Sequence, residues 1–191
     1  MRSVCTSAGG AAAMLAAIAA VAVAAPSKTV AISDPKGDVD GELDIQRAQL
    51  GLASDRRVRA VMTFAEKVDP RALLARSGPP GSACVRIWTK SDADPAAMPP
   101  DRLVCVTARS GDELRASVLQ QRDAGLPSNV ASASVGTVQS GRSLVVRFSQ
   151  SSLGRPERIR FAIEATQRGC PRVSCVDQAP GDGAVRSFRL R

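Results

Sequence analysis

Alternation of apolar and polar residues with a period of two recurs along this 191-residue chain, and it constrains the fold more than any other feature. Successive side chains of an extended strand point to opposite faces, so such alternation is typical of half-buried β-strands. The clearest example is the segment 57–64, whose apolar residues on one face are Val58, Ala60, Met62 and Phe64. We interpret this segment as a strand with that face in the core.

Eight further segments show the same alternation, or a short apolar run between turn residues. They are 43–52, 83–89, 102–108, 113–119, 130–136, 143–149, 158–165 and 184–191. About nine strands separated by Gly, Pro, Asp and Ser clusters predict an all-β fold, an antiparallel, jelly-roll-like β-sandwich. The piece 26–33 reads as a linker. One connector helix is expected from Asp69 as N-cap, Pro70 at the first position, and a run to Gly78.

The N-terminus has the composition of a secretory signal peptide. Arg2 precedes an uncharged run over 11–25 that ends in small residues, and this run is shorter than the ~20 residues that span a bilayer. We expect cleavage after Ala24, a single domain over 25–191, and a protein that is secreted or associated with the cell envelope. No membrane association is expected after cleavage.

Cysteine number agrees with export. Removing Cys5 with the signal leaves four cysteines, an even number that favours two disulfides in an oxidising compartment. Cys84 and Cys105 lie on two expected strands joined by one loop, so we predict that they pair across a hairpin. Cys170 and Cys175 are separated by four residues, which favours a structural staple rather than a redox-active motif.

Composition excludes several classes of function. The chain has no histidine, so Ser/His/Asp and Cys/His triads are absent, and we expect no enzyme activity. It has four Phe, one Trp and no Tyr, while its net charge of +8 comes mostly from scattered arginines. This pattern argues against nucleic acid as a partner, because bases lack stacking platforms. Attraction to anionic envelope polymers remains open.

The acidic stretch DPKGDVDGELDI, residues 34–45, stands out in a basic chain. Closely spaced carboxylates with glycine at turns suit calcium, which binds six to eight oxygens, but the spacing does not match an EF-hand. The same residues also favour a polar turn before a strand, since Asp caps its own backbone. Composition alone favours the turn and leaves the metal site open.

The stretch DPKGDVDGELDIQRAQLGL resembles the opening of carbohydrate-binding family 9-like and DOMON-like β-sandwich domains. The segments FSQSSLGRPERIRFAIEA and CVDQAPGDGAVRSF are similar to later parts of secreted actinobacterial members. The resemblance implies that the acidic loop and a C-terminal turn lie together, where some relatives hold calcium. The matching residues, and so the expected metal ligands, are Asp34, Asp38, Asp44 and Asp177. Asp40 and Glu42 have no assigned counterpart.

The sequence departs from ligand-binding relatives in two places. Trp88 alternates with Cys84 and Arg86 on an expected strand, so we interpret it as packing rather than as part of an aromatic clamp for a sugar. Met62 falls on the inward face of its strand, which favours a core position over a haem ligand.

We therefore expect a secreted, non-catalytic binding module at the cell envelope with a structural calcium site. Its partner would be a cell-envelope polysaccharide or protein. Two alternatives remain: a structural or accessory protein-interaction domain without a small ligand, and a carbohydrate-active enzyme that uses the acidic cluster.

Overall fold

The computed structural model describes residues 28–74, 81–121, 126–169, 175–181 and 183–191. The expected signal segment 1–24, and with it Cys5, lies outside the described residues, as does Cys170. Among the residues described, no helix has the length and apolar character needed to cross a membrane.

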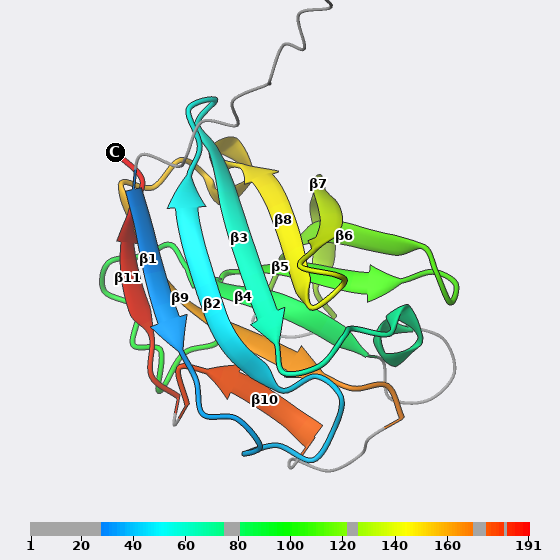
Figure 1. Cartoon of the computed structure of the whole chain (residues 1–191). Coiled ribbons are helices and arrows are strands. Elements are labelled where there is room, and N and C mark those ends of the chain that lie inside the picture. The colour runs from blue at the N-terminus through cyan, green and yellow to red at the C-terminus, as the bar shows by residue number, and fades with distance from the viewer. Residues whose placement is uncertain (1–27, 75–80, 122–125, 170–174, 182) are drawn as a thin grey trace, which may run out of the picture.

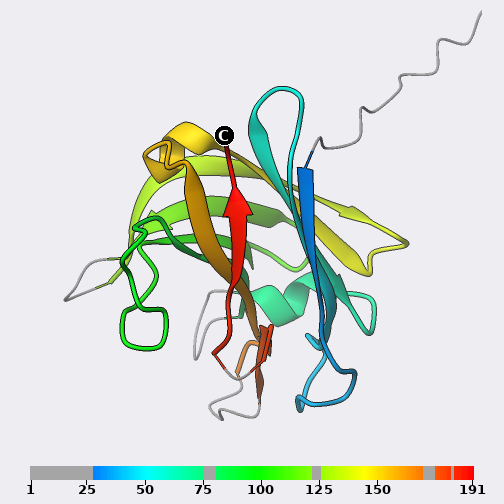
Figure 2. The same ribbon diagram turned by 90° about the vertical axis from the view of Figure 1, so that its left-hand side faces the viewer.

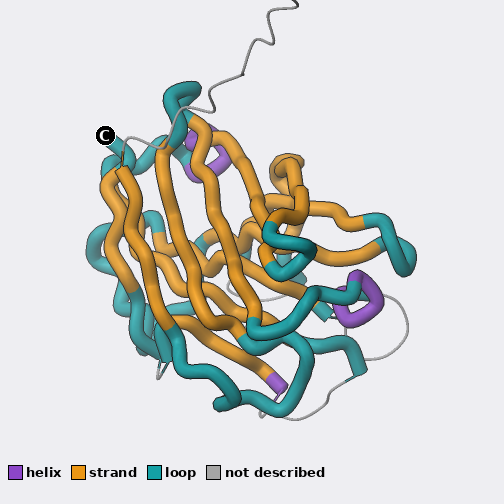
Figure 3. The backbone as a smooth tube through the Cα atoms, viewed as in Figure 1, coloured by secondary structure: helices purple, strands orange, loops and turns teal. Residues whose placement is uncertain are grey.

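Eleven strands and two short 3₁₀ helices form the described part of the chain. The strands are β1 (Lys28–Ser33), β2 (Ile45–Leu52), β3 (Arg57–Phe64), β4 (Ser82–Trp88), β5 (Arg102–Ala108), β6 (Leu114–Gln120), β7 (Ser128–Val138), β8 (Ser143–Ser149), β9 (Arg158–Thr166), β10 (Val176–Ala179) and β11 (Arg186–Arg189). The helices are η1 (Pro70–Leu73) and η2 (Gln150–Leu153). As Figure 3 shows, turns and helices lie mainly at the ends of the strands. The all-β prediction is confirmed.

All strand pairs are antiparallel, and the strand order is β1-β2-β3-β8-β7-β6-β5-β4-β9-β10, with β11 also paired to β9. The long strand β7 pairs with β6 through its first half and with β8 through its second, so it joins two layers. In Figures 1 and 2, β11 lies beside β1, which brings the two edges of the folded-over sheet together and makes it nearly barrel-like.

The core lies between the two layers and is filled by the alternating apolar residues of the strands. Val58, Ala60, Met62 and Phe64 of β3 are each 0% exposed, as the period-two pattern predicted. Their neighbours on β8 and β9 are also buried, including Leu144, Val146, Phe148, Ile159, Phe161 and Ile163. Burial of these side chains supplies the main driving force for the fold.

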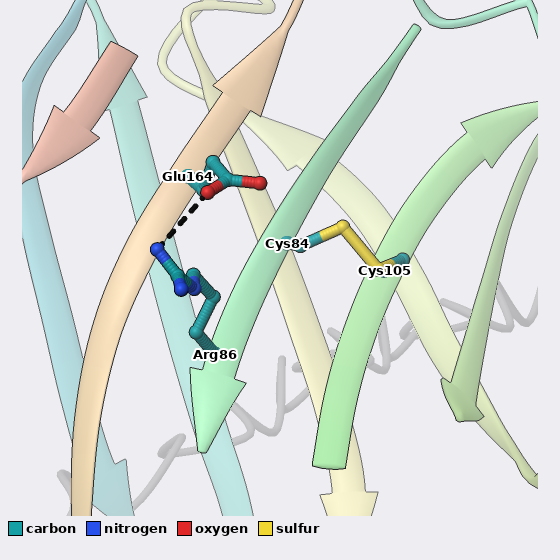
Figure 4. Close-up of a disulfide and its surroundings, with 4 residues drawn as sticks. All are labelled: Cys84, Arg86, Cys105 and Glu164. Carbon is teal, nitrogen blue, oxygen red and sulfur yellow. Dashed lines mark hydrogen bonds and ion pairs between the residues drawn. A yellow bond between two sulfur atoms is a disulfide. The ribbon is translucent and has the colours of Figure 1, made fainter. Parts of the chain in front are cut away.

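A disulfide joins β4 to β5. Cys84 and Cys105 are directly opposed in the antiparallel register, with their Cα atoms 4.0 Å apart, so the predicted hairpin pairing is confirmed. Figure 4 shows the disulfide next to an ion pair between Arg86 on β4 and Glu164 on β9, whose nitrogen and oxygen are 3.1 Å apart. Cys175 is buried and disulfide-bonded, but the pairing with Cys170 stays a prediction.

Trp88 at the end of β4 packs beneath the β4–β5 connection. Its Nε1 donates a hydrogen bond to the backbone oxygen of Met98 at 2.9 Å, and only 2% of its surface is exposed. The expectation that Trp88 is a packing residue is therefore confirmed.

Three local predictions were incomplete. The piece 26–33 was interpreted as a linker, but most of it forms β1, and the four-residue strand β10 was not foreseen. The expected helix begins as predicted, since the Asp69 side chain accepts a hydrogen bond from the Arg71 amide at 2.8 Å. It is a short 3₁₀ helix that ends at Leu73. The next residue, Leu74, is extended and forms a β-bridge with Ala108.

Candidate metal centre

The acidic connection between β1 and β2 lies against β10 at one end of the sandwich, in the lower part of both Figures 1 and 2. The connection is held at both ends. The Asp34 amide donates to the Gln46 carbonyl at 3.1 Å, which extends the β1–β2 ladder by one residue, and the Ala65 amide donates to the Asp44 carbonyl at 2.8 Å. These bonds hold the segment 34–44 as a closed loop facing β10.

Asp34, Asp38 and Asp177 meet at this end of the fold. One carboxylate oxygen from each lies within 4.8 Å of the others. Asp34 directly follows β1, Asp38 is exposed within the loop, and Asp177 belongs to β10 and is only 4% exposed. Residues more than 130 positions apart in the sequence therefore contribute to one acidic cluster.

Asp44 lies at the base of the same loop and is 6% exposed. Its Oδ2 accepts a hydrogen bond from the Gly37 amide at 2.8 Å, which fixes the loop turn. Its Oδ1 is buried and has no hydrogen-bond partner among the described residues, and the same is true of Oδ2 of Asp34. A buried carboxylate oxygen without a partner is costly, so these two atoms call for a cation or water.

The cluster raises the pKa of two of its members. The pKa of Asp34 rises from 3.8 to about 6, mainly because of burial and then because of the carboxylates of Asp177, Asp38 and Asp44. A backbone hydrogen bond from Gly181 acts in the opposite direction. The neighbouring carboxylates thus disfavour the charged form of Asp34.

The pKa of Asp177 also rises to about 6, again chiefly through burial. The hydrogen bond that its Oδ2 accepts from the Ile45 amide lowers the pKa, whereas the charges of Asp38 and Asp44 raise it. Burial and repulsion outweigh the hydrogen bonds, as expected where like charges share a site.

The geometry suits a hard cation. Calcium–oxygen distances of about 2.3 to 2.6 Å place oxygens on opposite sides of the ion roughly 4.6 to 5.2 Å apart, and ligands on the same side closer together. Oxygens within 4.8 Å of one another fall in this range. With carboxylates as the only donors and no histidine in the chain, calcium or magnesium fits better than a transition metal.

The structure brings three of the four predicted ligands together. Asp44 is not in the group of three but is close enough to affect the pKa of both Asp34 and Asp177. Glu42 is outside the group of three, and its backbone amide donates a hydrogen bond to Oε1 of Gln167 at 3.1 Å. No sequence pattern pointed to the amides of Ile45 and Gly181, because they are brought in by the pairing of distant segments.

The aromatic side chains provide no binding surface. The chain contains only five, Phe64, Trp88, Phe148, Phe161 and Phe188, and each is at most 2% exposed. A sugar ring or a base therefore has no exposed aromatic face on which to stack.

Comparison with protein-family models, with curated proteins and with solved structures finds no match to this chain.

Proposed function

We propose that this chain is an exported, non-catalytic binding module that acts at the cell envelope, with a calcium ion bound by Asp34, Asp38 and Asp177. The observation that carries the metal site is the convergence of three carboxylates within 4.8 Å, together with the unpartnered, buried oxygens of Asp34 and Asp44. The ion would tie the β1–β2 loop to β10 and so fix one end of the sandwich.

Electrostatics supports the presence of a cation. Two like charges about 4 Å apart repel by about 1 kcal/mol in bulk water and by about 4 kcal/mol near a protein surface. The raised pKa values of Asp34 and Asp177 reflect this repulsion and the burial of both groups. A divalent cation adds an attraction that offsets this repulsion, and it gives the carboxylate of Asp34 a partner for its buried oxygen.

Export and a non-catalytic role rest on different features. The Cys84–Cys105 disulfide and the signal-like segment both suit an oxidising compartment. The absence of histidine removes the commonest general base, and the burial of every aromatic side chain leaves no sugar-stacking site. Because glycoside hydrolysis uses carboxylates and needs no histidine, it is the missing sugar-stacking site that favours a binding or scaffolding role over this activity.

Calcium titration of the mature protein by isothermal calorimetry tests the metal site. We expect one calcium per chain with a Kd on the order of 0.1 to 1 mM, the range typical of extracellular modules. Asp38→Asn should abolish the heat of binding. Asp40→Asn, a change of the same charge in the same loop, should leave it intact because Asp40 is outside the group of three. Equal binding by both variants would exclude this site.

Retention on isolated cell-envelope material tests the binding role. The mature protein, incubated with washed envelope of the source cell, should sediment with it in calcium, and no release of reducing sugar should follow. Recovery of all the protein in the supernatant would contradict the binding role, and steady release of sugar would contradict the non-catalytic assignment.

A further inference from the structure

A pocket of about 530 Å³ lies between the β2–β3 turn, the segment around η2 and the end of the chain. Figures 1 and 2 place these elements at the end of the sandwich opposite to the acidic loop. Four arginines line the pocket, Arg56, Arg57, Arg155 and Arg191, and all four are exposed. We call this site the arginine pocket.

The positive charge of the arginine pocket is not neutralised within the described part of the chain. The single acidic residue that lines it is Asp55, and its Oδ1 accepts a hydrogen bond from the backbone amide of Arg57 at 2.9 Å. The ion pairs found between described residues are Arg86–Glu164 and Arg115–Glu113, and neither involves an arginine of the pocket. None of the four guanidinium groups thus has a carboxylate partner among the described ion pairs, and each keeps N–H donors for a ligand, although Arg191 uses one of its donors on the Arg155 carbonyl.

The backbone under two of these arginines is in a conformation that arginine disfavours. Arg56 has φ of 61° and Arg155 has φ of 55°, both in the left-handed region where glycine or asparagine is preferred. Two of the four non-glycine residues with positive φ in the described chain lie on this one pocket. Residues held in such disfavoured conformations cluster at binding and active sites.

Hydrogen bonds hold the rim of the pocket in place. The Gln150 side-chain amide donates to the Arg56 carbonyl at 2.9 Å, and the Arg155 amide donates to the Gln150 carbonyl at 3.1 Å. Arg191 donates from Nη2 to the Arg155 carbonyl at 2.7 Å. The β2–β3 turn, η2 and the chain end are thereby linked, so the rim of the arginine pocket is preorganised.

The positive surface continues from the pocket along the outer face of β3 and β8. Arg57 is paired in register with Ser149, and two residues further along, Arg59 is paired directly with Arg147. Like charges directly opposite each other on neighbouring strands are destabilising. Burial and the charge of Arg147 lower the pKa of Arg59. An anion lying across both side chains would relieve this repulsion.

We propose that the arginine pocket binds phosphate groups of an anionic polymer, which continues across the Arg59–Arg147 pair. Guanidinium groups bind phosphate through paired hydrogen bonds, and six of them along one track match a repeated anion better than a single ion. The burial of all five aromatic side chains argues against a neutral sugar chain and against single-stranded nucleic acid, whose exposed bases need stacking partners.

This inference rests on the proposed binding role and supplies its ligand class, but it does not depend on calcium. The arginine pocket and the acidic cluster share no residues and lie at opposite ends of the molecule. The two sites can therefore be tested separately in the same protein.

The test measures binding of the mature protein to polyphosphate by calorimetry, in chelator and again in calcium. The variant Arg56→Gln/Arg155→Gln removes two pocket arginines, and Arg109→Gln/Arg186→Gln makes the same charge change at exposed positions outside the pocket. We expect the pocket variant to bind polyphosphate at least about tenfold more weakly than wild type. The slope of the logarithm of its binding constant against the logarithm of the salt concentration should become shallower by roughly two, one for each lost phosphate contact. The control variant should bind within about twofold of wild type.

Further arms use inorganic phosphate, polygalacturonate and a single-stranded oligodeoxynucleotide. Weaker binding of all three than of polyphosphate supports the proposal. If inorganic phosphate binds as tightly as polyphosphate, the ligand is not a polymer. If polygalacturonate or the oligonucleotide binds more tightly than polyphosphate, the assignment of the ligand class is wrong. Equal losses in the two double variants would show attraction by net charge alone and would overturn the site.

Failure of this inference and failure of the proposed function give different results. If the envelope retains wild type and the pocket variant equally, the binding role stands and the arginine pocket is wrong. If the calcium titration shows no heat but polyphosphate binding depends on the pocket arginines, the metal site is wrong and this inference stands.

Discussion

The Asp177 carboxylate on β10 accepts a hydrogen bond from the backbone amide of Ile45 at the start of β2, although the two residues are 132 positions apart. This bond joins one sheet layer to the other at the acidic end of the fold. Both groups are buried, since Asp177 is 4% and Ile45 is 0% exposed. Asp177 thus has a structural bond on one oxygen and a place in the acidic cluster.

Replacing Asp177 by Ala should lower the free energy of unfolding in calcium by at least about 1 to 3 kcal/mol, because the buried Ile45 amide loses its acceptor and the proposed ion loses a ligand. Asp177→Asn keeps an acceptor oxygen but removes a charge, so in chelator it should be at least as stable as wild type. Urea unfolding of the three proteins measures this. Equal destabilisation by Ala and Asn in chelator would contradict a role of charge repulsion in the metal-free protein.

Metal-free protein should become more stable as the pH falls from about 7 towards 4. The pKa of Asp34 and of Asp177 is about 6 in the folded state and 3.8 ordinarily, so the folded state takes up protons first and protonation favours it. Protonation also removes the repulsion from Asp38 and Asp44.

Melting in chelator at several pH values, with Asp34→Asn as reference, isolates this effect from the titration of other carboxylates. The stability of wild type relative to the variant should rise through pH 6 as the pH is lowered. A relative stability that does not change with pH would show that Asp34 is charged and unstrained in the metal-free protein.

Loss of the disulfide should destabilise the fold without changing its architecture. Cys84 and Cys105 close a loop with a sequence separation of 21, and cross-links of this size contribute about 2 to 4 kcal/mol. We expect Cys84→Ser/Cys105→Ser to unfold at a lower denaturant concentration while its circular dichroism spectrum at low denaturant stays that of a β protein. An unchanged midpoint would show that the bond contributes no stability.

Gly81 allows η1 to pack against the start of β4. A Cβ atom at this position would lie 1.8 Å from the backbone oxygen of Ala72, which cannot move aside as a flexible side chain would. Gly81→Ala should therefore cost about 1 to 3 kcal/mol, the usual range for overpacking. Gly136→Ala is the matched control, because nothing lies within 4 Å of its added Cβ. Equal unfolding midpoints for both variants would contradict the close approach.

The sequence predicts the strands whose apolar residues alternate over seven or more positions. β3 and β9 were recognised because their inward residues form unbroken series, from Val58 to Phe64 and from Ile159 to Ala165. β10 was not predicted from the sequence. Of its four residues the two buried ones are an aspartate and an alanine, Asp177 and Ala179, which do not give an apolar alternation. β1 was not predicted either, because only one of its six side chains, that of Ile32, is buried.

The two sites differ in how far the sequence could reveal them. The acidic cluster takes two of its three residues from one short loop, so a local motif marks them, whereas Asp177 is expected only from the resemblance. The arginine pocket takes its residues from the β2–β3 turn, the segment after η2 and the chain end, and only the fold brings them together. In the sequence these arginines are indistinguishable from the others.

The melting temperature of the mature protein with and without calcium tests the central claim most directly. With about 5 mM calcium and a Kd of about 0.5 mM, binding adds about 1.4 kcal/mol, or roughly 3 to 6 °C for a domain of this size. Wild type and Asp40→Asn should show this rise relative to chelator, and Asp38→Asn should not. If wild type melts at the same temperature in both buffers, the acidic loop is a polar turn and no calcium site exists there.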